Sequence, residues 1–109
     1  MAITLPTPLA AYFAAANAHD TDAVLACFAA DARVRDEGKD LVGRDAIRAW
    51  KDRAQAKYRP TYVVTGLDAA DGRTVVTAEV SGTFPGSPVA LHHHFTLADG
   101  AIAALEIRT

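Results

Sequence analysis

Three polar side chains occupy positions that the hydrophobic pattern of the sequence assigns to buried faces. Tyr12 lies within an apolar helical stripe, Asp36 continues the strand phase of Ala32 and Val34, and His93 continues the apolar phase of a later strand. Burying such a group costs about 1–3 kcal/mol, and more for a charge, unless a partner satisfies it. Three exceptions on separate elements therefore indicate one shared, partly apolar cavity.

These three residue types together suit the removal of a proton next to a carbonyl group. A carboxylate in a partly apolar cavity can act as a general base, which is the role we assign to Asp36. Tyr12 and His93 can donate hydrogen bonds to the oxygen on which negative charge develops. The hypothesis is an isomerase, cyclase or dehydratase that acts on a small apolar carbonyl compound.

Each of the three residues also has a purely structural interpretation. Asp36 precedes Glu37-Gly38 and can form an Asx turn at an exposed strand end. Tyr12 can be a core tyrosine with its hydroxyl at the rim, and His93 can be a core histidine whose nitrogens are satisfied. The alternative function is then a non-catalytic module that binds a ligand in the pocket or assembles with a protein.

The run His92-His93-His94 invites a metal interpretation, but its spacing argues against one. On a strand, His92 and His94 share the face opposite His93 and supply only half of a zinc ligand set. No HxxxH, HExxH or paired-cysteine spacing supplies the other ligands. We therefore predict no metal and no cofactor, with His92 and His94 facing solvent or a second subunit.

The 109 residues, half of them hydrophobic, predict a single domain that spans residues 1–109. Charged residues make up 22% of the chain and the net charge is -2, so no overall field favours nucleic acid or an anionic membrane. The first eighteen residues carry no basic side chain and are interrupted by Pro6 and Pro8, unlike a secretory signal or a membrane span. With Cys27 as the single cysteine, we expect a cytoplasmic protein.

Three helices are predicted in the first half of the chain, near residues 6–16, 22–28 and 44–58. The first helix carries the apolar stripe that contains Tyr12. The predicted buried side of the third helix consists of Ile47, Trp50, Ala54 and Tyr58. Its predicted charged face consists of Arg44, Arg48, Lys51, Asp52 and Gln55. Because acidic residues are interspersed along this helix, we interpret the charged face as solvated rather than as a nucleic-acid site.

Strand patterns follow at residues 31–36, 61–67, 74–84, 89–97 and 101–108. In the last strand, Ala103, Leu105 and Ile107 are predicted to share one face. Three early helices followed by a long antiparallel meander predict an α+β domain whose helices cover one face of the sheet.

Five short segments of the chain together resemble a known family. They are YFAAANAHD at 12–20, DAV at 22–24, FAADARV at 28–34, VGRDAI at 42–47 and DGAI at 99–102. They resemble the NTF2-like superfamily, and within it the SnoaL-like and ketosteroid isomerase-like branch. The resemblance implies an NTF2-like or cystatin-like α+β roll, a cone-shaped, curved antiparallel sheet with three helices on its concave face. It also implies a hydrophobic pocket for a small apolar molecule and a homodimer formed through the sheet.

The resemblance also implies roles for individual residues. Tyr12 matches the oxyanion-hole tyrosine of ketosteroid isomerases, and Asp36 matches the aspartate that shuttles the proton. His93 falls at or near their second oxyanion donor, a protonated aspartic acid, and this departure argues against steroid isomerisation itself. The pocket is expected to be lined by Phe13, Phe28, Trp50, Tyr58, Phe84, Leu91 and Phe95.

Overall fold

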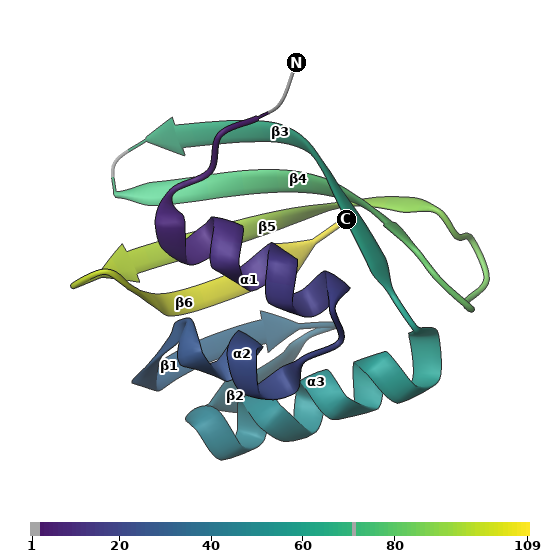
Figure 1. The fold of residues 1–109 in the computed structure, drawn as a ribbon, viewed down its shortest axis with the longest axis horizontal. Coiled ribbons are helices and arrows are strands. Elements are labelled where there is room, and N and C mark those ends of the chain that lie inside the picture. The colour runs from purple at the N-terminus through teal and green to yellow at the C-terminus, as the bar shows by residue number, and fades with distance from the viewer. Residues whose placement is uncertain (1–2, 71) are drawn as a thin grey trace.

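A computed structural model describes residues 3–70 and 72–109 of the chain. Its elements are α1 (Thr7–Asn17), α2 (Thr21–Ala26), β1 (Phe28–Asp36), β2 (Lys39–Val42), α3 (Arg44–Tyr58), β3 (Thr61–Ala70), β4 (Arg73–Ser81), β5 (Val89–Ala98) and β6 (Ala101–Arg108). The strands form one curved sheet in the order β2-β1-β6-β5-β4-β3, and the helices lie on its concave side (Figure 1). The predicted α+β roll is confirmed. Within the described ranges, no helix combines the length and the apolar character needed to cross a membrane.

The second helix is shorter than its sequence pattern predicts. Asp20 caps it, since its carboxylate accepts a hydrogen bond from the backbone N–H of Ala23 at 3.1 Å. The helix ends at Ala26, and Phe28 begins β1 instead of completing the helix. Pairing with β6 explains the change, because Phe28 lies opposite Ile102 in the sheet.

A short strand, β2, was not predicted, and it forms a tight hairpin with β1. The two strands pair from Arg33 opposite Val42 to Asp36 opposite Lys39. The turn between them is Glu37-Gly38, whose φ angles of 52° and 75° are those of a two-residue hairpin. This turn fixes Asp36 at the last position of β1.

The sheet contains one parallel pair, which departs from the purely antiparallel sheet predicted. β1 runs parallel to β6, and a long crossover through α3 and four strands makes that approach possible. β6 therefore lies between β1, which carries Asp36, and β5, which carries His93. A register shift between β5 and β6 also places Ile102 in the core, where the phase predicted Ala103.

Helix α3 begins and ends where the sequence predicts. The loop after β4 is hydrogen-bonded to the C-terminal end of this helix. The backbone N–H of Thr83 donates to the carbonyl oxygen of Tyr58 at 2.7 Å, and its hydroxyl donates to the carbonyl of Lys57 at 3.1 Å. Gly82 N–H donates to Ser87 Oγ within the loop at 2.9 Å. These contacts hold together the wide end of the roll, which is the end formed by the β4–β5 loop and the C-terminal end of α3.

Gly82→Ala tests this closure of the wide end. A methyl group at residue 82 would overlap the carbonyl oxygen of Tyr58 and press on the ring of Phe84. We expect the free energy of unfolding to fall by roughly 1–3 kcal/mol, as for other overpacked sites. Gly66→Ala is the matched control, because its methyl would meet Thr77 at an ordinary 3.5 Å. Denaturant unfolding measures both, and equal stabilities of the two variants would contradict this account.

Candidate functional site

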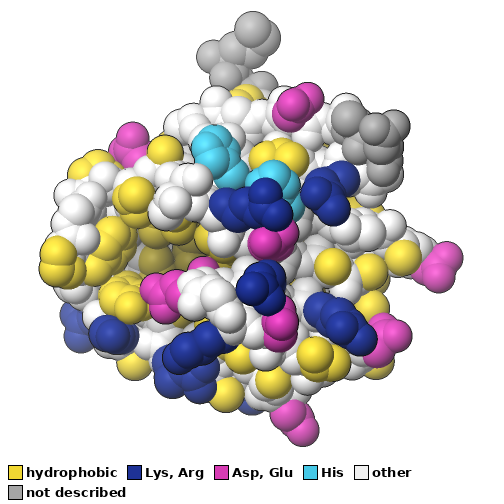
Figure 2. Space-filling model, turned by 180° about the vertical axis from the view of Figure 1, so that it is seen from behind, with side chains coloured by type: hydrophobic (Ala, Val, Ile, Leu, Met, Phe, Trp, Pro, Cys, Tyr) yellow, Lys and Arg dark blue, Asp and Glu magenta, His cyan; other side chains and the backbone are white. Residues whose placement is uncertain are grey.

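A cavity of about 930 Å³ opens between α3 and the concave side of the sheet. Its walls come from the β1–β2 turn, α3, the β4–β5 loop and the end of β6. Figure 2 shows its mouth as a hollow lined by hydrophobic side chains, with acidic side chains at one edge. The volume lies within the range that is typical of small-molecule sites.

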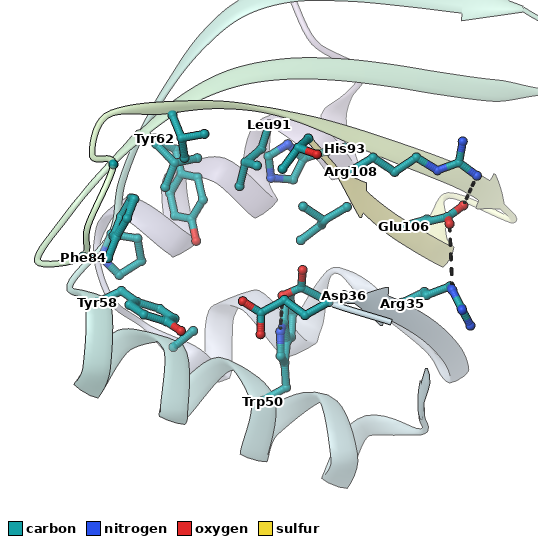
Figure 3. A pocket seen from close by; sticks show the side chains of 18 of the residues that line it. Arg35, Asp36, Trp50, Tyr58, Tyr62, Phe84, Leu91, His93, Glu106 and Arg108 are labelled. Atoms are coloured by element: carbon teal, nitrogen blue, oxygen red, sulfur yellow. Dashed lines mark hydrogen bonds and ion pairs between the residues drawn. The ribbon is translucent and has the colours of Figure 1, made fainter. Parts of the chain in front are cut away.

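Asp36 lines this cavity from the end of β1. It is half-buried, and its Oδ2 accepts a hydrogen bond from Trp50 Nε1 at 2.9 Å. Figure 3 shows the carboxylate pointing inward, on the side opposite His93 and Tyr62. The carboxylate is therefore held in place by an indole N–H while it remains open to a molecule in the cavity.

His93 lines the same cavity from the middle of β5 and is fully buried. Its Nδ1 lies 3.3 Å from the carbonyl oxygen of Val76. Because a carbonyl oxygen only accepts, Nδ1 carries the proton and Nε2 is left as an acceptor. Burial, followed by the nearby charge of Lys51, lowers the pKa of His93 to about 4. At neutral pH the ring is uncharged, and the buried Nε2 has no hydrogen-bond partner among the described residues.

Tyr12 does not line the cavity, unlike Asp36 and His93. Its side chain is fully buried, and its ring packs edge-to-face on Phe13, Phe28 and Phe95. The centres of these rings lie 5.1–5.9 Å from the centre of the Tyr12 ring. Its hydroxyl oxygen lies 3.2 Å from Lys51 Nζ. Tyr12 therefore sits behind Lys51, which separates it from the cavity.

Lys51 is the residue that the sequence interpretation misplaced. Predicted on the solvated face of α3, it is only 1% exposed and lines the cavity. Its Nζ donates to the hydroxyl oxygens of Tyr12 at 3.2 Å and Tyr62 at 3.1 Å. The spacing contained the signal, because Lys51 follows Ile47 by four residues and Trp50 by one, inside the buried stripe.

The surroundings of Lys51 are aromatic rather than acidic. Its ammonium lies 5.0–5.1 Å from the ring centres of Tyr12, Trp50 and Tyr62, a distance typical of cation–π contacts. Within the described ranges, no carboxylate lies within ion-pair distance of it. Burial lowers the pKa of Lys51 to about 8, and the charge of Asp36 opposes this shift. The amine therefore loses its proton far more readily than an exposed lysine.

Tyr62 presents its hydroxyl to the cavity from the start of β3. The Asn17 side chain holds this strand end, accepting from Tyr62 N–H at 2.7 Å and donating to its carbonyl at 2.9 Å. Burial, followed by the charge of Asp36, raises the pKa of Tyr62 to about 12. Tyr62 consequently keeps its proton at neutral pH and can donate it in a hydrogen bond.

The seven hydrophobic residues expected to line the pocket divide into two groups. Four of the seven lie on its wall, namely Trp50, Tyr58, Phe84 and Leu91. The other three, Phe13, Phe28 and Phe95, do not line it, which corrects the prediction. They pack around Tyr12 beneath α1, where the layers are too close together to leave a cavity.

His92 and His94 lie on the opposite side of the sheet from His93. Thr77 Oγ1 and His92 Nδ1 are 2.9 Å apart, across the pairing of β4 with β5. His94 lies on the same convex side and pairs with Glu106 of β6. In the part of the chain that the structure describes, no three His, Cys, Asp or Glu side chains gather as a metal site would require.

A family model described as a SnoaL-like domain matches residues 9–105. The chain belongs to the SnoaL-like family. A structure with 41% sequence identity, a putative polyketide cyclase from Sinorhizobium meliloti, superposes with a TM-score of 0.92 over 95% of each chain. A putative polyketide cyclase from Silicibacter sp. is 26% identical, with a TM-score of 0.82 over 94% of this chain and 85% of the other.

A third similar structure bears on the fold alone. It is a hypothetical protein from Catenulispora acidiphila with a ketosteroid isomerase-like fold, in complex with trimethylamine. It is 23% identical, with a TM-score of 0.84 over 97% of this chain and 87% of its own. No curated protein matches the sequence. The predicted membership of the SnoaL-like family is confirmed by the family model, and the predicted ketosteroid isomerase-like fold is confirmed by this similar structure.

The lowered pKa of Lys51 predicts a characteristic dependence of stability on pH. Between pH 8 and 10.5 the unfolded chain binds more protons at Lys51 than the folded chain, so folding becomes more favourable as pH rises. Lys51→Met lacks this contribution. We therefore expect its stability relative to the wild type to fall by roughly 3 kcal/mol from pH 8 to pH 10.5.

Denaturant unfolding at several pH values measures this difference. Lys57→Met is the control, because Lys57 is exposed on the same helix and should show no such trend. A stability difference between Lys51→Met and wild type that stays constant over this pH range would contradict the lowered pKa.

Proposed function

We propose that the cavity binds a small, largely apolar carbonyl compound and that Asp36 removes a proton from the carbon next to the carbonyl group. The observation that carries this proposal is that a carboxylate and a buried amine, Asp36 and Lys51, line the same cavity. Trp50 holds one carboxylate oxygen of Asp36, which leaves the other oxygen available to accept the proton.

Removal of that proton places negative charge on the carbonyl oxygen, which needs hydrogen-bond donors. Lys51 is mostly protonated at neutral pH, and two of its three N–H bonds are directed at Tyr12 and Tyr62. The third is available to a ligand, since no acceptor for it is found among residues 3–70 and 72–109. A fixed donor of this kind typically contributes a factor of about 10²–10³ to the rate. In this arrangement Tyr62 is a second donor, and Tyr12 positions Lys51.

His93 takes a different role from the one expected for it. Its Nε2 is an acceptor, so it recognises a hydroxyl group of the ligand instead of stabilising an oxyanion. Asp36 and His93 lie on strands two apart, with backbones separated by roughly 10 Å. The side chain of Ile107 on the intervening strand, β6, lines the cavity between them. A substrate with a carbonyl group near Asp36 and a hydroxyl group near His93 fits this arrangement.

The similar structures support this class of chemistry. Two of them carry the name of a polyketide cyclase, and closing a carbon ring onto a carbonyl group generally begins with proton loss beside another carbonyl. Isomerisation and dehydration begin with the same step, and the proposal covers these reactions as one class. The homodimer through the sheet and the cytoplasmic location stay predictions.

Exchange of hydrogen for deuterium tests the proposal without knowledge of the natural substrate. 2-Tetralone and cyclohexanone serve as probes in D₂O, and NMR follows the loss of the protons next to the carbonyl group. We expect the protein to accelerate exchange, and Asp36→Asn to lower that acceleration by about 10²–10⁴-fold, as removal of a general base does.

Asp68→Asn is the matched control, because Asp68 is exposed on β3 and does not line the cavity. It should exchange at the wild-type rate. Full activity in Asp36→Asn would refute the assignment of the base. If both probes raise the melting temperature but undergo no accelerated exchange, the non-catalytic binding module is the correct function.

A further inference from the structure

Lys51 is placed unusually for a charged side chain. Buried ammonium groups are normally accompanied by a carboxylate, because an isolated charge is poorly tolerated away from water. Lys51 is 1% exposed, and its hydrogen-bond partners are two tyrosine hydroxyl groups. Burial keeps the pKa of both Tyr12 and Tyr62 above the ordinary value, so neither supplies a tyrosinate as counter-ion.

The other titratable groups around Lys51 do not change this picture. His93 on β5 faces it and is neutral, because its pKa is lowered to about 4. Among the residues that the structure describes, Asp36 on β1 is the group whose charge favours the protonated amine, and desolvation outweighs it. With a pKa of about 8, roughly a tenth of the Lys51 side chains are neutral amines at pH 7. An exposed lysine, which titrates above pH 10, has a far smaller neutral fraction.

The position of the amine favours a reaction within the cavity over one with bulk water. Lys51 lines the cavity, yet almost none of its surface reaches solvent. Neither water nor a molecule in the cavity reaches the amine freely in this position, so Lys51 must turn its nitrogen toward a carbonyl compound bound beside it, and water, which would reverse a condensation, has little access. A lysine desolvated in an apolar pocket is a recognised nucleophile toward carbonyl carbon.

We propose that Lys51 condenses with a ligand aldehyde or ketone and holds it as a covalent imine. The inference rests on the proposed function only for the class of ligand, a carbonyl compound. The neutral Lys51 nitrogen attacks the carbonyl carbon, a C–N bond forms, and the oxygen leaves as water. Starting from the ammonium form, one carbonyl compound gives one protonated imine and one water molecule, so protons and charge balance without an oxidant or a reductant.

In the imine, Lys51 activates the ligand through a protonated C=N group, which replaces its role as a donor to the carbonyl oxygen, while the role of Asp36 is unchanged. A protonated imine withdraws electrons from the neighbouring carbon more strongly than a neutral carbonyl group. Asp36 would then remove the proton from that carbon and leave an enamine. Tyr62, whose hydroxyl lies 3.1 Å from the Lys51 nitrogen, is placed to exchange a proton with the departing oxygen.

Reductive trapping tests the imine directly. The protein is incubated at pH 7 with benzaldehyde or cyclohexanone and sodium cyanoborohydride, and labelled residues are found by peptide mass mapping. The chain has three lysines, Lys39, Lys51 and Lys57, so two exposed lysines act as internal controls. We expect Lys51 to be labelled at least ~10-fold faster than either, because its neutral fraction is larger.

The pH profile gives a second readout that does not depend on a variant. The rate of Lys51 labelling should stop rising with pH near pH 8, where the amine becomes mostly neutral. Lys51→Met should remove the fast label, and Lys57→Met should leave it. Equal rates at the three lysines, or labelling of Lys39 and Lys57 without Lys51, would overturn the inference.

Asp36→Asn separates this inference from the proposed function. Fast labelling at Lys51 in this variant, together with loss of deuterium exchange, is the result expected if both are correct. Exchange that depends on Asp36 without any label on Lys51 would leave the proposed function standing and reject the imine. A label on Lys51 with exchange unaffected by Asp36→Asn would support the imine and reject Asp36 as the base.

Discussion

The burial of one amine connects three elements of this domain. Lys51 extends from α3 and reaches the hydroxyl groups of Tyr12 on α1 and Tyr62 on β3. Taking an ammonium group out of water without an anionic partner costs several kcal/mol, and packing elsewhere must offset that cost. A buried lysine at this position therefore lowers the free energy of unfolding relative to an apolar side chain. Such a loss of stability is characteristic of functional sites.

The shape of the roll determines where polar side chains can contact a bound molecule. At the narrow end, Phe13, Phe28 and Phe95 pack around Tyr12 and fill the space beneath α1. At the wide end, the β4–β5 loop is bound to the end of α3, and a cavity remains. Asp36, Lys51 and His93 lie where the packed core meets this cavity. They are shielded enough for their electrostatic interactions to be strong, yet accessible to a small molecule.

Much of this arrangement could be predicted from local patterns in the sequence. The bounds of α3 and the inward phases of Asp36 and His93 follow from periodicity, and the structure has them as predicted. Lys51 was assigned to solvent from its charge, although its helical position lies in the buried stripe. The division of the aromatic residues between core and cavity depends on the curvature of the sheet, which short-range patterns do not encode. The acceptor role of His93 depends on the carbonyl of Val76, which belongs to a neighbouring strand.

Both proposals depend on Lys51 being a desolvated amine at the wall of a binding cavity. The most direct test is an NMR titration of the lysine ¹³Cε resonances, which number only three, with Lys51→Met to assign the signal. We expect a midpoint of about 8 for Lys51. A midpoint at the ordinary value of 10.5 would show that the amine is solvated, and would contradict the account.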